Sequence, residues 1–380
     1  MAMPQDYFGI GSIGCLQDIL AQEKLHYIFL VHGKESYRTS GADQKLSPLL
    51  AGYHVIHFTD FSSNAKVEDV EKGIMLFREQ QGDFVIAIGG GSALDLGKAI
   101  ALLADCPEKP EEYIKKKAVL HGRKIPLVAI PTTAGTGSEA THFAAIYVDK
   151  KKYSLAHPSL IPDYAIIDPS LTFSLPSYQT ACTGMDALSQ AIESYWSIHS
   201  TPESKRYAAK AIPLALAHLE NAVCNPTPEA RISMAKAANL AGKAINISFT
   251  TACHAVSYPI TSYFNVPHGH AVALTLDHMF MYNAAMTSTD CGDPRGIDYV
   301  RRTMDELANL FGVSSPLHVQ QRLQNLLDSI GLKRSLRELG ISAAADIGLI
   351  IQHGFNPERV KNNPRLVTEE SLRGMLERIK

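Results

Sequence analysis

The sequence lacks three features that would place it in a special class of protein. It has no apolar run close to the ~20 residues that a membrane-spanning helix needs, no CxxC pair among its six cysteines, and a formal net charge of only −2. A chain with so little net charge has no bulk attraction to nucleic acid or to an anionic membrane surface. Scattered cysteines, and an opening stretch without a basic run followed by an apolar one, are typical of free thiols in a reducing compartment. We therefore expect a cytoplasmic protein that binds neither nucleic acid nor membrane.

The chain does have 380 residues, enough for two domains, and 46% of them are apolar. Its first part alternates short apolar runs with helical patterns, which is typical of an α/β fold. Because the apolar runs are nearly continuous, they suit a parallel sheet that is buried on both faces. We predict strands at residues 27–31, 55–58, 84–88 and 126–130, helices at 67–80 and 92–103, and a hairpin of 144–149 with 153–156.

After residue 178 the pattern becomes almost entirely helical. Thr201 and Thr227 are each followed by proline and glutamate, the sequence that caps and starts a helix. The fold class we expect is an α/β Rossmann-like parallel-sheet domain at the N-terminus and an all-α domain at the C-terminus. Residues 1–178 would bind a nucleotide, and residues 179–380 would bind a metal and the substrate, with ligands held in a cleft between the domains.

A buried strand ends in Gly89, Gly90 and Gly91, and a helix is expected to begin at Ser92. Glycines allow a tight turn and a close approach of the backbone, and a helix N-terminus attracts an anion such as a phosphate. The spacing matches neither the GxGxxG fingerprint nor a Walker loop, and a turn without a ligand is the alternative.

A second loop, "PTTAGTGSEAT", also follows a buried strand and carries the hydroxyls of Thr132, Thr133, Thr136 and Ser138. Two loops rich in glycine and hydroxyl groups, at the ends of neighbouring strands, suit a polyphosphate with its ribose better than one small anion. Together the loops therefore predict a dinucleotide site.

Asp186 and three clustered histidines, His254, His268 and His270, indicate a metal site. Two imidazoles and a carboxylate make a suitable ligand shell for Fe²⁺ or Zn²⁺ with an open position for a substrate oxygen. Spacing alone does not prove that residues on separate helices meet, so a structural role for the histidines stays open at this point.

Four motifs, "GGGSALDLGK", "PTTAGTGSEAT", "GMDAL…AIE" and "HAVSYPITSYFNVPHGHA", resemble in order and spacing the signatures of the iron-containing (group III) alcohol dehydrogenases. That family transfers hydride between NAD(P)H and a carbonyl. The resemblance implies that the dinucleotide is held by residues of both loops, namely Gly89, Gly90, Gly91, Ser92, Asp95, Lys98, Thr132, Thr133 and Ser138. It implies one divalent metal, Fe²⁺ or Zn²⁺, held by Asp186, His254 and His268.

The sequence departs from the family pattern at two positions. Gln190 stands one turn after Asp186, where the family has its fourth metal ligand, a histidine. We expect Gln190 to supply a weaker fourth bond, or to leave a three-ligand site with water. Tyr258 stands where many members have a histidine that relays a proton, and Tyr258 or His270 is the expected proton donor.

Three stretches, "SQAIESYWSIHSTPES", "HAVSYPITSYFNVPHGHAVALTLDH" and "NPERVKNNPRLVTEESL", resemble the family branch that reduces phosphonoacetaldehyde and the related sulfoacetaldehyde reductases. Such two-carbon aldehydes carry a tetrahedral anion, which needs a cationic or N–H-rich pocket. Our candidates for that pocket are His142, His270 and Arg365. Gly33 stands where relatives that prefer NAD often have an aspartate, and without that carboxylate the 2′-phosphate of NADPH is permitted. The resemblance to this branch favours NADH, so we expect NADH with NADPH possible.

Alternatives remain at this level. They are a generic short-chain alcohol or lactaldehyde dehydrogenase of the same family, a glycerol-type dehydrogenase or dehydroquinate-synthase-like lyase of the same architecture, and a metal-free nucleotide-binding pseudoenzyme. We also expect a homodimer or higher oligomer, because an N-terminal edge strand is predicted and relatives assemble in this way.

Overall fold

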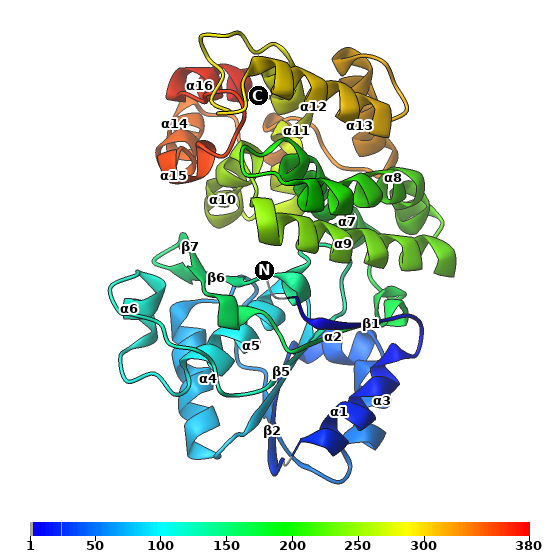
Figure 1. Cartoon of the computed structure of the whole chain (residues 1–380), viewed down its shortest axis with the longest axis vertical. Coiled ribbons are helices and arrows are strands. Elements are labelled where there is room, and N and C mark those ends of the chain that lie inside the picture. Colours follow the sequence, from blue (N-terminus) through cyan, green and yellow to red (C-terminus); the bar gives the residue numbers. More distant parts are fainter. Residues whose placement is uncertain (1–2, 24) are drawn as a thin grey trace. The chain divides into compact units, whose positions relative to one another are not determined.

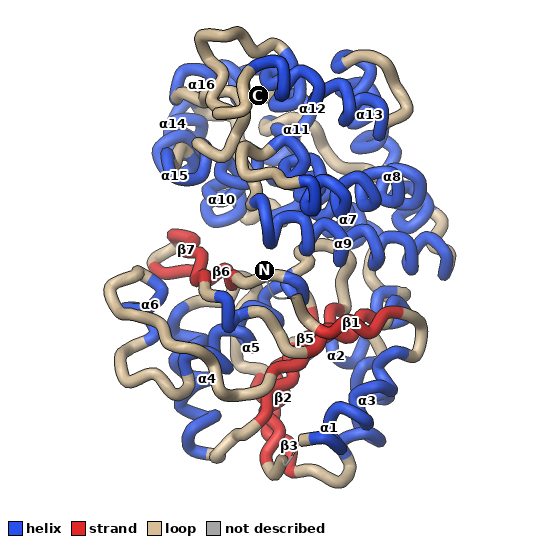
Figure 2. Tube along the Cα trace, in the orientation of Figure 1, coloured by secondary structure: helices blue, strands red, loops and turns tan. Residues whose placement is uncertain are grey.

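The computed structural model describes residues 3–23 and 25–380. It divides into two compact units, Met1–Leu175 and Pro176–Lys380. The strands lie only in the first unit, and the second consists of helices and loops (Figures 1 and 2). The predicted boundary, residue 178, is the second residue of helix α7 (Ser177–Trp196).

The first unit is built on a six-stranded sheet, and every strand pairs in parallel with its neighbours. The strands occur in the order β1-β8-β5-β4-β2-β3, and their bounds are β1 Gln5–Phe8, β2 Tyr27–His32, β3 His54–Phe58, β4 Phe84–Gly89, β5 Leu127–Pro131 and β8 Tyr164–Ile167. The expected parallel-sheet fold is confirmed. Strand β8 was not among the predicted strands.

Both faces of the sheet are buried, which explains the continuous apolar runs. Val85 and Ala87 of β4 pack into one apolar core, whereas Phe84 and Ile86 pack into the other, since successive side chains of a strand point to opposite faces. The helices that supply these cores and the rest of the unit are α1 Leu16–Gln22, α2 Lys34–Thr39, α3 Ala42–Leu50, α4 Val67–Glu79, α5 Gly91–Leu103 and α6 Pro110–Ile114. The predicted hairpin is present as β6 (Phe143–Val148) and β7 (Lys151–Ala156).

The chain order of the strands reverses between β2 and β4. From β2 the chain runs outward to β3, then returns to the opposite side of β2 to form β4 and continues to β5. In parallel α/β sheets, ligands bind beyond the carboxyl ends of the strands at such a switch point. Gly33 follows β2, Gly89 ends β4, and Thr132 follows β5. The residues expected to bind the dinucleotide therefore lie together at the carboxyl ends of these strands.

The second unit consists of helices around buried α7. They are α8 Pro202–Cys224, α9 Pro228–Ser248, α10 Ala252–Phe264, α11 His268–Ala284, α12 Ile297–Leu310, α13 Pro316–Ser329, α14 Ala344–Gly354, α15 Pro357–Val360 and α16 Glu369–Arg378. The predicted caps are present, because Thr201 and Thr227 each accept a backbone N–H three residues on, at 3.2 Å. Among the described helices, none combines the length and the apolar character needed to cross a membrane.

Candidate metal centre and cofactor loops

Helix α7 turns three polar side chains toward its buried face. Asp186, Gln190 and Glu193 are four and three residues apart, so they follow one another along one side of the helix. Their exposed fractions are only 3%, 4% and 0%. A carboxylate is rarely buried without a partner that compensates its charge. Two buried carboxylates and an amide on one face therefore require partners from other helices.

Those partners come from α10 and α11. The Nε2 atom of His254 lies 3.3 Å from Asp186 Oδ1, and that of His268 lies 4.0 Å from the same oxygen. Asp186, His254 and His268 each offer one ligand atom, and these atoms lie within 4.8 Å of one another. In a tetrahedral shell with bonds of ~2.1 Å, ligand atoms are about 3.4 Å apart. The cluster is therefore close to the dimensions of a metal shell.

Gly269 allows the two helices to come this close. A Cβ atom at this position would lie 1.8 Å from the Cys182 carbonyl oxygen and 2.9 Å from Asp186 Cβ. Any side chain would therefore push the start of α11, which carries His268, away from α7. The glycine of the "PHGH" motif is explained by this approach.

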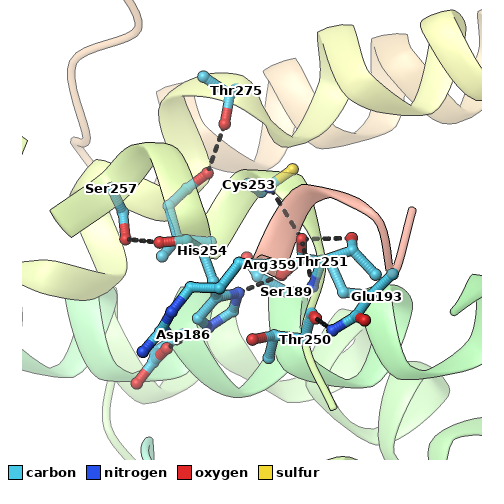
Figure 3. Close-up of polar contacts among 12 residues, drawn as sticks. Asp186, Ser189, Glu193, Thr250, Thr251, Cys253, His254, Ser257, Thr275 and Arg359 are labelled. Carbon is cyan, nitrogen blue, oxygen red and sulfur yellow. Dashed lines mark hydrogen bonds and ion pairs between the residues drawn. The ribbon is translucent and has the colours of Figure 1, made fainter. Parts of the chain in front are cut away.

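The outer nitrogen of each imidazole is occupied. His254 Nδ1 bonds Glu193 Oε2, while Glu193 Oε1 also accepts the N–H groups of Thr251 and Cys253 at 3.2 and 2.9 Å (Figure 3). His268 Nδ1 lies 3.3 Å from the Ser257 hydroxyl oxygen, whose own hydrogen goes to the His254 carbonyl. When Nδ1 carries the proton, the Nε2 lone pair faces Asp186. This is the tautomer that binds a metal ion.

The electrostatics of the cluster favour a cation. Burial alone would lower the pKa of His254, but the Glu193 and Asp186 carboxylates on either side raise it to about 10. A site that holds a proton so strongly has an excess of buried negative charge. A divalent cation would balance the two carboxylates and leave both imidazoles neutral.

Gln190 supplies an independent test of whether a metal fits. Its Oε1 atom is buried and has no hydrogen-bond partner in residues 3–23 and 25–380. An unpaired buried carbonyl oxygen is unfavourable by ~1–3 kcal/mol, so it usually has a role. Gln190 lies one helical turn from Asp186 on the same side of α7, so its amide oxygen is a candidate for a fourth donor. The donor set of two imidazoles, one carboxylate and one amide oxygen fits Fe²⁺ or Zn²⁺.

In the first unit, the turn from β4 to α5 has the tight geometry that its glycines predict. Gly89 has a φ of +150°, a region that side chains rarely adopt, and a Cβ there would lie 2.8 Å from Ala93 Cβ. A Cβ on Gly91 would lie 2.7 Å from Thr136 Cγ2. The two expected loops therefore pack against each other at the N-terminus of α5, the end of a helix that favours an anion.

Asp95 and Lys98 of α5 hold the second loop in place. Asp95 accepts the Ser138 hydroxyl and, at 2.8 Å, the Ala145 N–H. The fully buried Lys98 ammonium has Ser138, Thr141 and Phe143 oxygens within 2.6–3.2 Å. Burial lowers the pKa of Lys98 to about 8, although nearby Asp95 raises it. Asp95 and Lys98 would therefore hold the second loop in position, and the Lys98 side chain is itself fully buried.

Comparison with known proteins places this architecture in a family. The sequence matches the profile of iron-containing alcohol dehydrogenases over residues 4–169, and the C-terminal profile of the Fe-containing alcohol dehydrogenase family over residues 180–379. The chain belongs to the iron-containing alcohol dehydrogenase family. The resemblance drawn from the sequence motifs is confirmed, and the chain is an oxidoreductase of the alcohol dehydrogenase and aldehyde reductase class.

Three relatives illustrate the range of this family. The phosphonoacetaldehyde reductase of Streptomyces viridochromogenes is 35% identical over 308 residues, 79% of this chain and 76% of that protein. Long-chain-alcohol dehydrogenase 1 of Geobacillus thermodenitrificans is 30% identical over 378 residues, 98% and 94% of the two chains. The crystal structure of sulfoacetaldehyde reductase from Bifidobacterium kashiwanohense in complex with NAD⁺ is 33% identical, with a TM-score of 0.89 over 100% of this chain and 97% of that chain.

The remaining candidate residues for cofactor binding lie beyond the same carboxyl ends of the strands. Gly33 precedes α2, and a Cβ there would lie 2.5 Å from the Ser36 hydroxyl oxygen. Thr132 and Ser138 are buried, whereas Thr133 is partly exposed. Ser92 accepts the Asn64 N–H at 3.0 Å.

Tyr258 lies beside the cluster and connects it to a residue that sequence reasoning missed. Its ring stacks on that of His268, with centroids 5.7 Å apart and planes inclined by 12°. Arg359 of α15 donates a hydrogen bond to the Tyr258 hydroxyl at 2.6 Å and lies over its ring. Glu193, which bonds His254, was also missed as a site residue, although it lies in the "GMDAL…AIE" motif. Its position three residues after Gln190 was the available signal, whereas Arg359 lies in a short helix without a comparable pattern.

The three residues expected to bind the substrate anion have other partners. Burial lowers the pKa of His270, and its two ring nitrogens bond the Tyr178 hydroxyl at 3.1 Å and the Lys333 carbonyl at 2.8 Å. Arg365 pairs with Asp290 at 2.8 Å and donates to the Tyr282 carbonyl at 2.7 Å. His142 lies in the first unit, and its ring packs edge-on against Phe143.

Proposed function

We propose that this family member is an NAD(P)H-dependent, metal-dependent reductase of a small aldehyde with an anionic head group. The reaction would convert sulfoacetaldehyde to isethionate, or phosphonoacetaldehyde to 2-hydroxyethylphosphonate. One NADH and one proton are consumed for each aldehyde, and NAD⁺ and the alcohol are released. The observation that carries the proposal is the cluster of Asp186, His254 and His268. The two reductases among the relatives support the choice of substrate.

Four residues would hold the metal, namely Asp186, Gln190, His254 and His268. A bound Fe²⁺ or Zn²⁺ supplies Lewis-acid chemistry, which stabilises negative charge on a carbonyl oxygen. Glu193 and Ser257 orient the imidazoles through their Nδ1 atoms. Because these partners are buried inside the helical unit, they fix the ring planes before any ligand arrives.

The glycine and threonine loops of the first unit would bind the dinucleotide. The N-terminus of α5, at Gly90 and Gly91, favours the pyrophosphate, while Asp95 and Lys98 keep the second loop against it. Position 33 is a glycine, so it has no carboxylate to accept a hydrogen bond from the ribose hydroxyl of NADH. NADPH would therefore be accepted as well, with NADH the expected cofactor because the sulfoacetaldehyde reductase structure contains NAD⁺.

Tyr258 is the proposed proton donor to the product oxygen. Its hydroxyl oxygen accepts a hydrogen bond from Arg359, so a positive charge lies beside the group that would give up the proton. Stacking on His268 fixes the ring beside a proposed metal ligand. A tyrosine is suited to this step when a positive charge lies beside it.

A second candidate is a dehydrogenase of neutral alcohols. It is favoured by the long-chain-alcohol dehydrogenase, a relative whose match covers 98% of this chain and 94% of its own length. The two candidates separate in one assay of initial rates with sulfoacetaldehyde, phosphonoacetaldehyde, lactaldehyde and propanal at equal concentration. We expect kcat/KM for at least one anionic aldehyde to exceed that for propanal by a factor of 10 or more, as a charge-assisted contact of ~1.5–3 kcal/mol gives. Equal efficiency with propanal would reject the anionic substrate.

The expected homodimer or higher oligomer stays a prediction. Strand β1 lies at an edge of the sheet, where unpaired backbone groups can pair with another chain. Light scattering of the purified protein gives the mass directly. A monomer at micromolar concentration would contradict the expectation.

A further inference from the structure

Arg359 differs from two other arginines of its unit, which pair with carboxylates. Arg295 pairs with Asp293 at 2.7 Å, and Arg365 pairs with Asp290 at 2.8 Å. The half-buried guanidinium of Arg359, in contrast, has the Tyr258 hydroxyl as its one side-chain hydrogen-bond partner within the described residues. Its charge is therefore not neutralised by a carboxylate in that part of the chain.

The Tyr258 ring fixes where this charge lies. The Arg359 guanidinium carbon is 4.6 Å from the centroid of the ring, and the same ring stacks at 5.7 Å on His268. The three side chains form a continuous stack that begins at His268, a proposed metal ligand, and ends at the Arg359 guanidinium. A guanidinium held on an aromatic face loses little conformational freedom when it binds an anion.

A two-carbon aldehyde matches this arrangement. Its anionic head group is attached to the carbon next to the carbonyl. A cation that binds the head group must therefore lie close to the group that binds the carbonyl oxygen. A guanidinium offers five N–H donors in a planar fork, which binds two oxygens of a sulfonate or phosphonate at once. With one N–H used on Tyr258, donors remain for both oxygens.

We propose that Arg359 binds the anionic head group of the substrate and that Tyr258 holds the guanidinium in place for it. This assignment rests on the proposed function, because it names the residue that selects the anionic aldehyde. Arg359 thus determines specificity, while Asp186, His254 and His268 serve carbonyls of any kind. Arg365, by contrast, is paired with Asp290 and the Tyr282 carbonyl and serves as the comparison.

The test compares the wild-type protein with Arg359→Gln, Arg359→Lys and the matched control Arg365→Gln. The measured quantity is the ratio of kcat/KM for sulfoacetaldehyde, or for phosphonoacetaldehyde, to that for propanal. We expect Arg359→Gln to lower this ratio ~10- to 100-fold through loss of charge-assisted hydrogen bonds. Arg359→Lys keeps the charge but loses the fork, so its ratio is intermediate. Arg365→Gln keeps the wild-type ratio.

Calorimetric titration with isethionate and 2-hydroxyethylphosphonate, in the presence of NAD⁺, measures recognition of the head group without turnover.

The outcomes separate the two levels of the argument. If the wild-type protein does not prefer anionic aldehydes over propanal, the proposed function fails and the assignment fails with it. If the wild type prefers them and folded Arg359→Gln and Arg359→Lys both keep the ratio within about threefold, the proposed function stands and the assignment of Arg359 is overturned. A fall for Arg365→Gln as large as that for Arg359→Gln also overturns it.

Discussion

Gly269→Ala tests whether the close approach of α7 and α11 builds the metal centre. The added Cβ would lie 1.8 Å from the Cys182 carbonyl oxygen, whereas ordinary contact begins near 3.4 Å. Because the obstacle is the backbone of the buried helix α7, the helices must separate by about 1.6 Å. Overpacking of this kind is destabilising by ~1–3 kcal/mol. For a unit of this size, that lowers the melting temperature by ~2–12 °C.

The same substitution should weaken metal binding, because the shift moves His268 relative to Asp186. Metal–ligand distances tolerate only ~0.2 Å, so we expect the affinity for Zn²⁺, measured by competition with a chromogenic chelator, to fall at least ~10-fold. Gly374→Ala in α16 is the matched control, since a Cβ there meets no atom within 4 Å. That change should stabilise the helix by ~0.5–1 kcal/mol. Wild-type melting temperature and Zn²⁺ affinity in Gly269→Ala would refute the reasoning.

Three further predictions address single groups. Glu193→Gln removes the negative charge bonded to His254 Nδ1, so Zn²⁺ affinity in the chelator assay should fall ~10- to 100-fold. The control is Glu306→Gln, because the Glu306 carboxylate accepts a hydrogen bond from Tyr195 at 3.0 Å. Equal affinities of the two variants would contradict the role of Glu193. Gln190→His replaces an amide oxygen with an imidazole and should tighten Zn²⁺ binding, while unchanged affinity would show that this side chain does not contact the metal. Lys98 has a pKa of about 8 when folded and 10.5 as its ordinary value, so the unfolded chain binds the extra proton and the free energy of unfolding rises by about 3 kcal/mol between pH 8 and 10.5. Lys98→Met should lose that rise in urea titrations, and parallel pH profiles of the two proteins would contradict it.

Much of the fold could be predicted because period and apolarity are local properties. The strand at 84–88 and the helix at 92–103 occur within a residue of their expected bounds, as β4 and α5. Strand β8 was missed because its four residues, Tyr164–Ile167, are too short for a clear pattern. Its place between β1 and β5 depends on pairing with segments far away in the chain.

The candidate site shows the same division. The helical period already places Asp186 and Gln190 on one side of α7, but the meeting of α7, α10 and α11 depends on tertiary packing around Gly269. The partner of Arg359 is Tyr258, 101 residues earlier. No pattern in a single sequence encodes such a contact, so Arg365 in the neighbouring "NNPR" stretch was the candidate instead.

The central claim is that the residues facing one another on α7, α10 and α11 form a metal centre required for carbonyl reduction. The most direct measurement strips the purified protein of metal and follows NADH oxidation with sulfoacetaldehyde while Fe²⁺ or Zn²⁺ is added in known amounts. We predict negligible activity without metal and a linear rise to a plateau at one ion per chain, with no such rise for Asp186→Asn. Full activity in metal-free protein, or a nucleotide-binding chain that stays inactive at every metal level and with every aldehyde, would contradict the account.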